Sequence, residues 1–279
     1  MPAKYRQLLT GIRRRNLESK QRNQKEDSGG DRMPIVEFKN VFLSKNDEKG
    51  KAIEILRDLS FAVEPGVVYA LAGPSGSGKS SALRLINRLD DYSDGQIYIA
   101  GQEVKDWDIR KLRARVGFMF QEAALFPGSV MDNVLYGLCL RGLKKCHHEP
   151  TALELLNKVG LPAELLRRNV ESLSGGQKQR VNLARTLALD PDIILMDEPT
   201  SSLDPAAANT IENLIQELNQ QGKTFILVSH NFEQIERIAA ACTILEDGRG
   251  IFSGTPAELF SDPDVANLLM NGKGAKVDE

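Results

Sequence analysis

The stretch GPSGSGKSS at residues 73–81 constrains this chain more than any other part of it. It directly follows the apolar run VVYALA (67–72) and opens a helical pattern, SSALRLINRL (80–89). A glycine-rich loop between a buried strand and a helix lets backbone N–H groups surround phosphate oxygens. The pattern GxxxxGK[ST] in this context is a phosphate-binding P-loop. The chain is therefore predicted to hold a nucleotide in an α/β domain.

Each part of this loop has an expected partner on a nucleotide. Lys79 supplies a point charge for the β- and γ-phosphates, and the Ser80 hydroxyl is offered to Mg²⁺. The glycines let backbone N–H groups of the loop surround the phosphate oxygens. The predicted phosphate-binding residues are Gly73, Pro74, Ser75, Gly76, Ser77, Gly78, Lys79, Ser80 and Ser81.

Two kinds of apolar pattern occur along the rest of the chain. Almost continuous apolar runs indicate strands buried on both faces of a parallel sheet, at 67–73, 192–198 and 224–230. Partly alternating runs indicate half-buried antiparallel strands, at 35–44, 54–66 and 95–101. Helical patterns occur at 80–89, 176–189 and 206–221. Strand, helix and strand in this order predict an α/β fold.

Strand patterns are missing from about Glu122 to Ser172, within the segment at about 122–175. There VMDNVLYGLCLRG, EPTALELLNKVG and AELLRR look helical or turn-like, so an inserted helical subdomain is predicted. Near the end, Asp247-Gly248 between TILE and GIFSG indicates a hairpin, and PAELF indicates a last helix.

In DIILMDEP, two carboxylates follow a buried run. Asp197 and Glu198 should lie at the carboxyl end of a strand, where α/β sheets bind their ligands. Neighbouring strand residues point to opposite faces, so the two should differ in role. Asp197 suits the Mg²⁺ shell, which leaves Glu198 to polarise the attacking water as a general base.

Two more polar residues end apolar runs. His230 closes TFILVSH, and its place beside the expected phosphate edge favours a γ-phosphate contact over an ordinary structural histidine. Gln121 follows VGFMF, where its amide could bond Mg²⁺ or the lytic water and report the γ-phosphate to a moving element. Either residue by itself is a weak signal.

The order of these motifs, with LSGGQ at 173–177 and SSLD after the acidic pair, resembles the ATP-binding cassette of ABC transporters. The resemblance covers about residues 35–260, and LSGGQ is its most diagnostic part. It implies a P-loop NTPase fold with a mixed core sheet, an antiparallel β-subdomain and an inserted α-helical subdomain. It also implies two cassettes that close head to tail over two ATP molecules.

Carried over residue by residue, the resemblance implies a role for each motif. Gln121, Glu198 and His230 are the expected catalytic residues, and Ser80, Gln121 and Asp197 the expected Mg²⁺ ligands. ATP hydrolysis is predicted because every catalytic position is intact. Further nucleotide contacts are expected from the signature residues Ser174, Gly175, Gly176 and Gln177, which serve the γ-phosphate of a partner cassette, and from Asp204 of the D-loop (Ser202–Asp204).

One position departs from the family pattern. Family members usually place an aromatic ring on the adenine shortly after the first strand, where this chain has Lys45. Phe42 could substitute for the ring, or the Lys45 stem could lie over the base.

The chain has neither a coiled-coil insertion nor a second cassette nor membrane helices of its own, which leaves a separate subunit of a multi-chain transporter. The expected partners are a second copy, separate polytopic membrane subunits docking on the Gln121 and helical-subdomain surface, and a substrate-binding protein. LRLINRL and FPGSVMDNVLYG are similar to phosphate-importer cassettes and to related metal or sugar-nucleotide cassettes. The alternative is an ABC ATPase without a channel, acting as a regulatory or assembly module.

Charge and cysteine content complete these expectations. The net charge of -2 suggests no nucleic-acid partner, and three scattered cysteines suggest a reduced, cytosolic compartment. The resemblance to transporter cassettes implies a peripheral place at the cytoplasmic face of a membrane. The contiguous residues Cys146, His147, His148 and Glu149 lack the spacing of a metal site. Residues 1–33 are expected to form a basic, disordered leader, with Met33 a possible start of the functional protein. The ABC ATPase domain then covers 34–270 and a tail 271–279.

Overall fold

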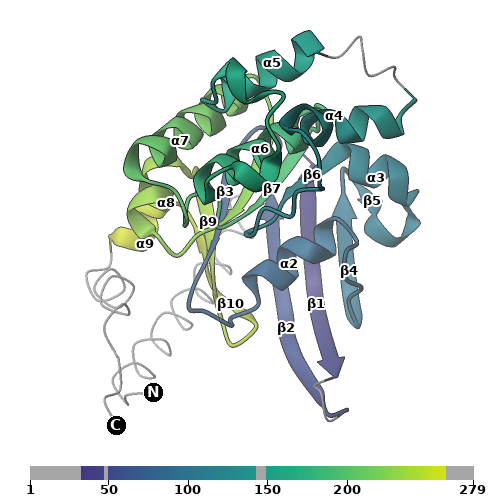
Figure 1. Cartoon of the computed structure of the whole chain (residues 1–279). Coiled ribbons are helices and arrows are strands. Elements are labelled where there is room, and N and C mark those ends of the chain that lie inside the picture. Colours follow the sequence, from purple (N-terminus) through teal and green to yellow (C-terminus); the bar gives the residue numbers. More distant parts are fainter. Residues whose placement is uncertain (1–32, 47–49, 143–148, 262–279) are drawn as a thin grey trace. The chain divides into compact units, whose positions relative to one another are not determined.

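The computed structural model describes residues 33–46, 50–142 and 149–261 (Figure 1). These residues form two compact units. Unit 1 comprises 33–65, 69–106 and 229–261, and unit 2 comprises 66–68 and 107–228. The expected leader up to residue 32, the tail 271–279, and the Cys146–His148 part of the cysteine and histidine cluster lie outside the described residues. In the described ranges no helix has both the length and the apolar character needed to cross a bilayer.

Unit 1 contains an antiparallel sheet. Its strands, in the order β2-β1-β4-β5, are β2 (Ala52–Val63), β1 (Val36–Asn46), β4 (Asp94–Ile99) and β5 (Gln102–Glu103). In register, Val36 lies opposite Val63 on one side and Ile99 on the other. The apolar side chains of β1 that alternate along the strand are buried. This confirms the half-buried antiparallel strands predicted from the alternating runs.

The rest of unit 1 leads the chain into and out of the predicted P-loop. β3 (Val68–Ala72), which enters this unit at Tyr69, pairs in parallel with β9 (Ala241–Glu246). β9 and β10 (Arg249–Gly254) form the predicted hairpin, with both turn residues at positive φ. The remaining elements are the helices α2 (Lys79–Ile86), α8 (Phe232–Ile238) and α9 (Pro256–Phe260) and the 3₁₀ turn η1 (Val104–Asp106).

Unit 2 is built on three parallel strands, β6 (Val116–Met119), β7 (Ile193–Asp197) and β8 (Thr224–Val228). β7 is the middle strand, with Ile193 opposite both Val116 and Thr224. Every residue of β7 and β8 is buried, as the continuous apolar runs predicted. The fold is therefore α/β with a separate antiparallel sheet. Neither β6 nor α3 (Ile109–Arg115) just before it was predicted from the sequence.

Helices cover the unit 2 strands and form the predicted helical segment (Figure 1). α4 (Val130–Leu140) and α5 (Glu149–Lys158) pack against α6 (Gly175–Leu187), and α6 in turn packs on β6. α7 (Pro205–Gln220) packs on β8. Two 3₁₀ turns precede α6, at Ala163–Leu165 and Val170–Ser172.

Helix α4 begins at Val130, where the helical sequence pattern VMDNVLYGLCLRG also begins. Residues between Gln121 and Ser129 form a loop, and the first helix starts at Val130. Asn133, which is 1% exposed, holds this loop by accepting from the Phe126 N–H at 2.8 Å and donating to the Phe126 and Ser129 carbonyls. The loop is therefore ordered by a side chain of the helix that follows it.

Candidate functional site

The P-loop lies in unit 1 between β3 and α2, as predicted. Two of its glycines cannot be replaced without a collision. A Cβ atom on Gly73 would meet the carbonyl oxygen of Leu245, and one on Gly78 would lie 2.6 Å from Leu56 Cδ2. Their φ angles of 135° and 101° also favour glycine. Glycine at these positions therefore lets the P-loop pack closely against Leu245 and Leu56.

The Lys79 ammonium lies inside this loop. It donates to the carbonyl oxygens of Gly73 at 2.9 Å and Pro74 at 2.7 Å, and the residue is only 7% exposed. α2 starts at Lys79, so the positive end of the helix dipole faces the same loop. A held cation, a helix N-terminus and a glycine backbone together fit the charge and shape of a phosphate chain.

The hairpin at the end of β9 braces the P-loop. The Gly248 N–H donates to the Ser77 carbonyl at 3.2 Å, and the Gly248 carbonyl accepts from the Arg57 N–H at 2.8 Å. The sequence predicted this hairpin but not its contact with a loop some 170 residues earlier. No local pattern could have indicated it.

His230 also belongs to unit 1 and is exposed. Its neighbours hold the backbone around it. The Ser229 N–H donates to the Leu71 carbonyl of β3 at 3.3 Å, and the Ser229 hydroxyl donates to Gln234 Oε1 at 2.8 Å. Asn231 caps α8 by accepting from the Gln234 N–H. The contacts of Ser229 and Asn231 that hold this backbone were not predicted, although Asn before a helical pattern is a recognisable N-cap signal.

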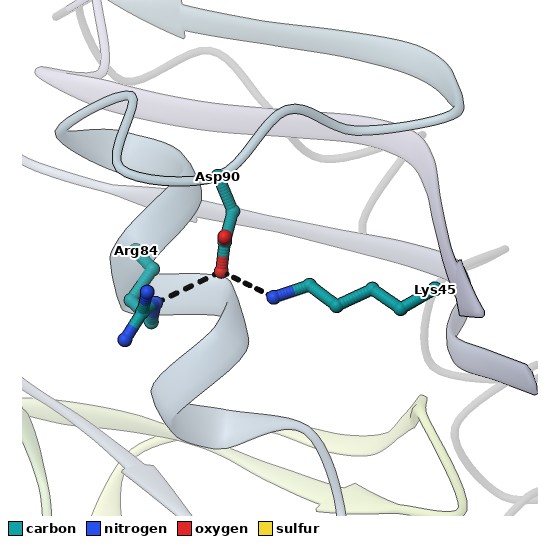
Figure 2. A network of polar contacts seen from close by, with 3 residues as sticks. All are labelled: Lys45, Arg84 and Asp90. Carbon is teal, nitrogen blue, oxygen red and sulfur yellow. Dashed lines mark hydrogen bonds and ion pairs between the residues drawn. The ribbon is translucent and has the colours of Figure 1, made fainter. Parts of the chain in front are cut away.

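Lys45 forms part of a charged network within unit 1. Lys45 Nζ lies 2.7 Å from Asp90 Oδ2, and Arg84 Nε on α2 lies 2.9 Å from the same oxygen (Figure 2). Burial alone would raise the pKa of Asp90, but the hydrogen bonds from Lys45 and Arg84 outweigh it and hold that pKa below its usual value. Opposite Lys45 on β2 lies Ile53, which is 49% exposed. Lys45 therefore joins the end of β1 to the helix that follows the P-loop.

The predicted acidic pair lies at the carboxyl end of β7 in unit 2. Asp197 is the last residue of the strand and is buried. Glu198 follows with φ at 51°, in the left-handed region, and its N–H donates to the Val228 carbonyl at 3.1 Å. The two carboxylates therefore have different backbone surroundings because β7 ends at Asp197. The alternation of side chains along a continuing strand, on which the prediction rested, is not the cause of this difference.

Gln121 lies at the same edge of the unit 2 strands. β6 and β7 are parallel neighbours with Met119 opposite Met196, so Gln121 and Asp197 both follow the carboxyl ends of their strands. Gln121 is exposed. The structure thus brings Gln121 to the edge that was predicted for Asp197 and Glu198.

The signature residues begin α6. The Ser174 hydroxyl accepts from the Gln177 N–H at 3.3 Å, and Gln177 Oε1 accepts from the Ser174 N–H at 3.0 Å, which forms a capping box. Ser174 and Gly175 are exposed. Nothing lies within 4 Å of the place where a Gly175 Cβ would be, so this surface is open to another molecule.

The D-loop contacts the start of the same helix. A Cβ atom on Gly176 would lie 3.3 Å from Leu203 Cδ2. Asp204 accepts from the Ala207 N–H at 2.9 Å and so caps α7. One oxygen of the Asp204 carboxylate therefore has a structural role besides any role toward a nucleotide.

The expected Mg²⁺ ligands divide between the two units. Ser80 lies in the first turn of α2 in unit 1, whereas Gln121 and Asp197 lie in unit 2. A hydroxyl, an amide and a carboxylate are oxygen donors of the kind that Mg²⁺ prefers. In the described part of the chain, no group of three or more His, Cys, Asp and Glu residues could hold a metal.

Comparison with protein families matches residues 56–201 to the family described as ABC transporter. The glutamine transport ATP-binding protein GlnQ of Escherichia coli is 38% identical over 84% of this chain and 97% of that protein. The phosphate import ATP-binding protein PstB 1 of Yersinia pestis is 40% identical over 75% of this chain and 82% of that protein. Relatives of nearly equal similarity thus differ in what they transport.

A solved structure of similar fold is the dimeric ATP-binding cassette MJ0796 in a post-hydrolysis state, bound to ADP and Pi. It superposes with a TM-score of 0.74 at 31% identity and covers 80% of this chain and 99% of that one. The likeness extends across both units of the described chain.

Proposed function

We propose, from the premise that this chain belongs to the ABC transporter family as an ATP-hydrolysing cassette, that two copies of it close over two ATP molecules. The observation that supports this most is the start of α6, where Ser174 and Gly175 are exposed and open to another molecule. The dimeric state of the similar cassette MJ0796 agrees with the proposal. ATP bound at the interface then holds the two copies together.

Unit 1 of each copy holds the triphosphate. The P-loop backbone around Gly73 and Gly78 donates N–H groups to phosphate oxygens, and Lys79 exchanges its loop carbonyls for the β- and γ-phosphates. His230 reaches the γ-phosphate from the segment after β8. These contacts are made within one copy, so a single cassette binds ATP.

Unit 2 supplies the hydrolytic groups. When bound, Mg²⁺ neutralises charge on the β- and γ-phosphates, and Ser80, Gln121 and Asp197 are the residues that would hold it. Glu198, which follows the last residue of β7, accepts a proton from the attacking water. The Gln121 amide would bond to the bound Mg²⁺ or to the attacking water and so report the presence of the γ-phosphate.

The signature completes the site of the other copy. Ser174 uses its hydroxyl oxygen to accept the Gln177 N–H, which leaves the hydroxyl hydrogen to donate to a γ-phosphate oxygen. The first N–H groups of α6 and its helix dipole add to this attraction. Asp204 lies beside this surface, where it can contact the nucleotide across the dimer.

We infer that the dimer works at the cytoplasmic face of a membrane, docked on separate polytopic subunits through the Gln121 loop and the helical segment. The relatives named for transport of glutamine and of phosphate support a transport role over a regulatory one.

We propose phosphate as the solute, supplied by a substrate-binding protein, because PstB 1 and the LRLINRL and FPGSVMDNVLYG segments favour it. Uptake of labelled phosphate by the co-purifying membrane subunits tests the substrate, and uptake of another solute alone would refute it.

The change Glu198→Gln tests the hydrolytic role. It removes the proton acceptor while keeping the size of the side chain, so kcat for ATP should fall at least about a hundredfold. The Kd for ATP should stay unchanged, because the P-loop is untouched. Glu217→Gln on the exposed side of α7 is the control and should hydrolyse ATP like the wild type. Near wild-type turnover by Glu198→Gln would refute the assignment.

A further inference from the structure

Three polar side chains of α6 reach the loop that follows β6, within unit 2. Gln179 Nε2 and Asn182 Nδ2 both donate to the carbonyl of Phe120, at 3.3 and 3.4 Å. Arg185 donates from its NH1 group to the carbonyl of Ala124 at 2.9 Å. Residues three apart on a helix lie along one face, so these side chains form a row facing the loop. The loop is thus fastened at two points to one helix.

Arg185 is the strongest of these fasteners. Its NH2 group donates to Asn182 Oδ1 at 2.8 Å while NH1 holds the Ala124 carbonyl. Its guanidinium carbon lies 5.4 Å from the centre of the Phe126 ring, and that ring contacts the Tyr136 ring in a tilted arrangement with centroids 4.4 Å apart. Burial lowers the pKa of Arg185. Partial burial of a cation costs free energy unless the cation is hydrogen-bonded. Here the Ala124 carbonyl and the Asn182 amide oxygen accept those hydrogen bonds. The planar guanidinium presents its donors to both acceptors in a fixed geometry, which a lysine ammonium does not offer.

The two fastened carbonyls lie on either side of Gln121. Phe120 precedes it, and Ala124 follows three residues later. The same helix begins with the signature serine, Ser174, and Arg185 lies eleven residues further along it. At a rise of about 1.5 Å per residue, that separation is roughly 16 Å of rigid helix. Any shift of Ser174 along with α6 therefore pulls on both sides of Gln121.

We propose that Arg185, with Asn182, is a positioning residue that ties the Phe120–Ala124 loop to the signature helix, so that Gln121 moves together with Ser174. The inference rests on the proposed function, since it gives the contact with a partner's γ-phosphate a route to the Gln121 loop. It is a mechanical link made by side chains, distinct from the contacts that Gln121 and Ser174 make with the nucleotide.

The test compares Arg185→Met with Arg180→Met in the full-length chain. Arg180 lies on the same helix and also donates to a backbone carbonyl, that of Gly160 at 2.7 Å, but this carbonyl is remote in sequence from Gln121. Each change therefore removes an arginine-to-carbonyl bond from α6. We expect Arg185→Met to lower kcat for ATP about tenfold with the Kd for ATP unchanged, and Arg180→Met to change kcat less than about twofold.

Two further variants separate positioning from general destabilisation. Arg185→Lys keeps the charge and reaches one of the two acceptors, so its kcat should lie between those of the wild type and Arg185→Met. Asn182→Ala removes the second acceptor. Combining it with Arg185→Met should cost less than the product of the two single effects, because both changes break the same link.

Hydrogen exchange gives a readout independent of turnover. Amides of residues 121–126 should exchange faster in Arg185→Met than in the wild type, while amides within α4 keep their rates. Equal kcat losses in Arg180→Met and Arg185→Met, or unchanged exchange in residues 121–126, would overturn the proposal. Loss of turnover in Glu198→Gln tests the proposed function separately, so either inference can fail without the other.

Discussion

At the scale of single residues, Glu198 shows how surroundings impose a conformation that the residue does not favour alone. Its φ of 51° is left-handed, which costs a residue with a side chain on the order of 1 kcal/mol. The hydrogen bond from its N–H to Val228 and the turn in which the Ser201 N–H and hydroxyl donate to its carbonyl hold it there. A strained backbone beside Asp197 is consistent with a carboxylate placed for chemistry.

Cys242 provides a prediction at this scale. Burial, with a smaller effect of Glu258, raises the pKa of its thiol to about 12, whereas Cys139 is exposed. Because only the thiolate reacts, a thiol of that pKa is roughly a thousandfold less ionised at pH 8 than an ordinary one. We expect alkylation of native protein to label Cys139 and spare Cys242, as read by peptide mapping. Denatured protein is the control and should label both, whereas fast labelling of native Cys242 would contradict the prediction.

At the scale of elements, the Asp90 network joins β1 to α2. Lys45 contributes from the strand and Arg84 from the helix, and both charges meet one carboxylate oxygen (Figure 2). Ion pairs that are partly exposed contribute little by themselves, but two cations on one carboxylate hold both elements at once. The helix so held is the one that begins with Lys79, so the network supports the geometry of the P-loop.

The pH dependence of Asp90→Asn tests this link. The folded pKa of Asp90 is lowered, so its ionised form stabilises the fold above the unfolded pKa of about 3.9, and this contribution disappears as the pH falls through the folded value. The variant should be less stable than the wild type at pH 7, and the difference should shrink below about pH 4. Urea unfolding across this range measures it.

Asp91→Asn is the matched control, because Asp91 is the exposed neighbour in the chain. Its stability difference from the wild type should be small at pH 7 and should vary little with pH. An Asp90→Asn deficit that stays constant from pH 7 to pH 3 would show that the carboxylate charge is not what joins the strand to the helix.

At the scale of the whole molecule, the predicted functional residues are divided between the two compact units. Unit 1 carries the P-loop and His230, and unit 2 carries Gln121, the signature and the acidic pair. Under the proposed function, the signature of unit 2 serves the nucleotide of another copy. Binding of ATP and closure of the dimer are then separable steps, the first needing one chain and the second needing two.

The variant Ser174→Asp should separate these steps. Aspartate keeps the N-cap acceptor of α6, so the helix stays capped, but its charge repels a partner's γ-phosphate. In a Glu198→Gln background we expect ATP-driven dimerisation to be lost while a single chain binds ATP with unchanged Kd. Sedimentation velocity with and without ATP measures dimerisation, and calorimetry measures the Kd for ATP.

Thr255→Asp is the control for the charge and the cap. Thr255 forms the same kind of capping box at the start of α9 in unit 1, so its aspartate variant should still dimerise. Weakened ATP binding by the Ser174→Asp monomer would contradict the assignment of Ser174 to a partner's nucleotide.

Much of the fold followed from local patterns. Continuous apolar runs predicted β7 and β8, alternation predicted β1, β2 and β4, and Asp247-Gly248 predicted the hairpin of β9 and β10. These succeeded because burial on one face or two leaves its own period in the sequence. The loop before Val130 did not follow from a local pattern, because the Asn133 side chain and Arg185 of α6 hold it.

The sequence by itself determined that this chain is an ATP-hydrolysing cassette, and it placed the P-loop, the signature and the acidic pair on the correct strands and helices. It could do so because phosphate binding needs closely spaced glycines, a lysine and a helix start, which local sequence encodes. Only the tertiary structure decided that Lys45 meets Asp90 and that Arg185 holds Ala124. The first contact joins residues that are 45 positions apart in the sequence, and the second joins residues that are 61 positions apart. Side chains so far apart in the sequence meet only after the chain has packed.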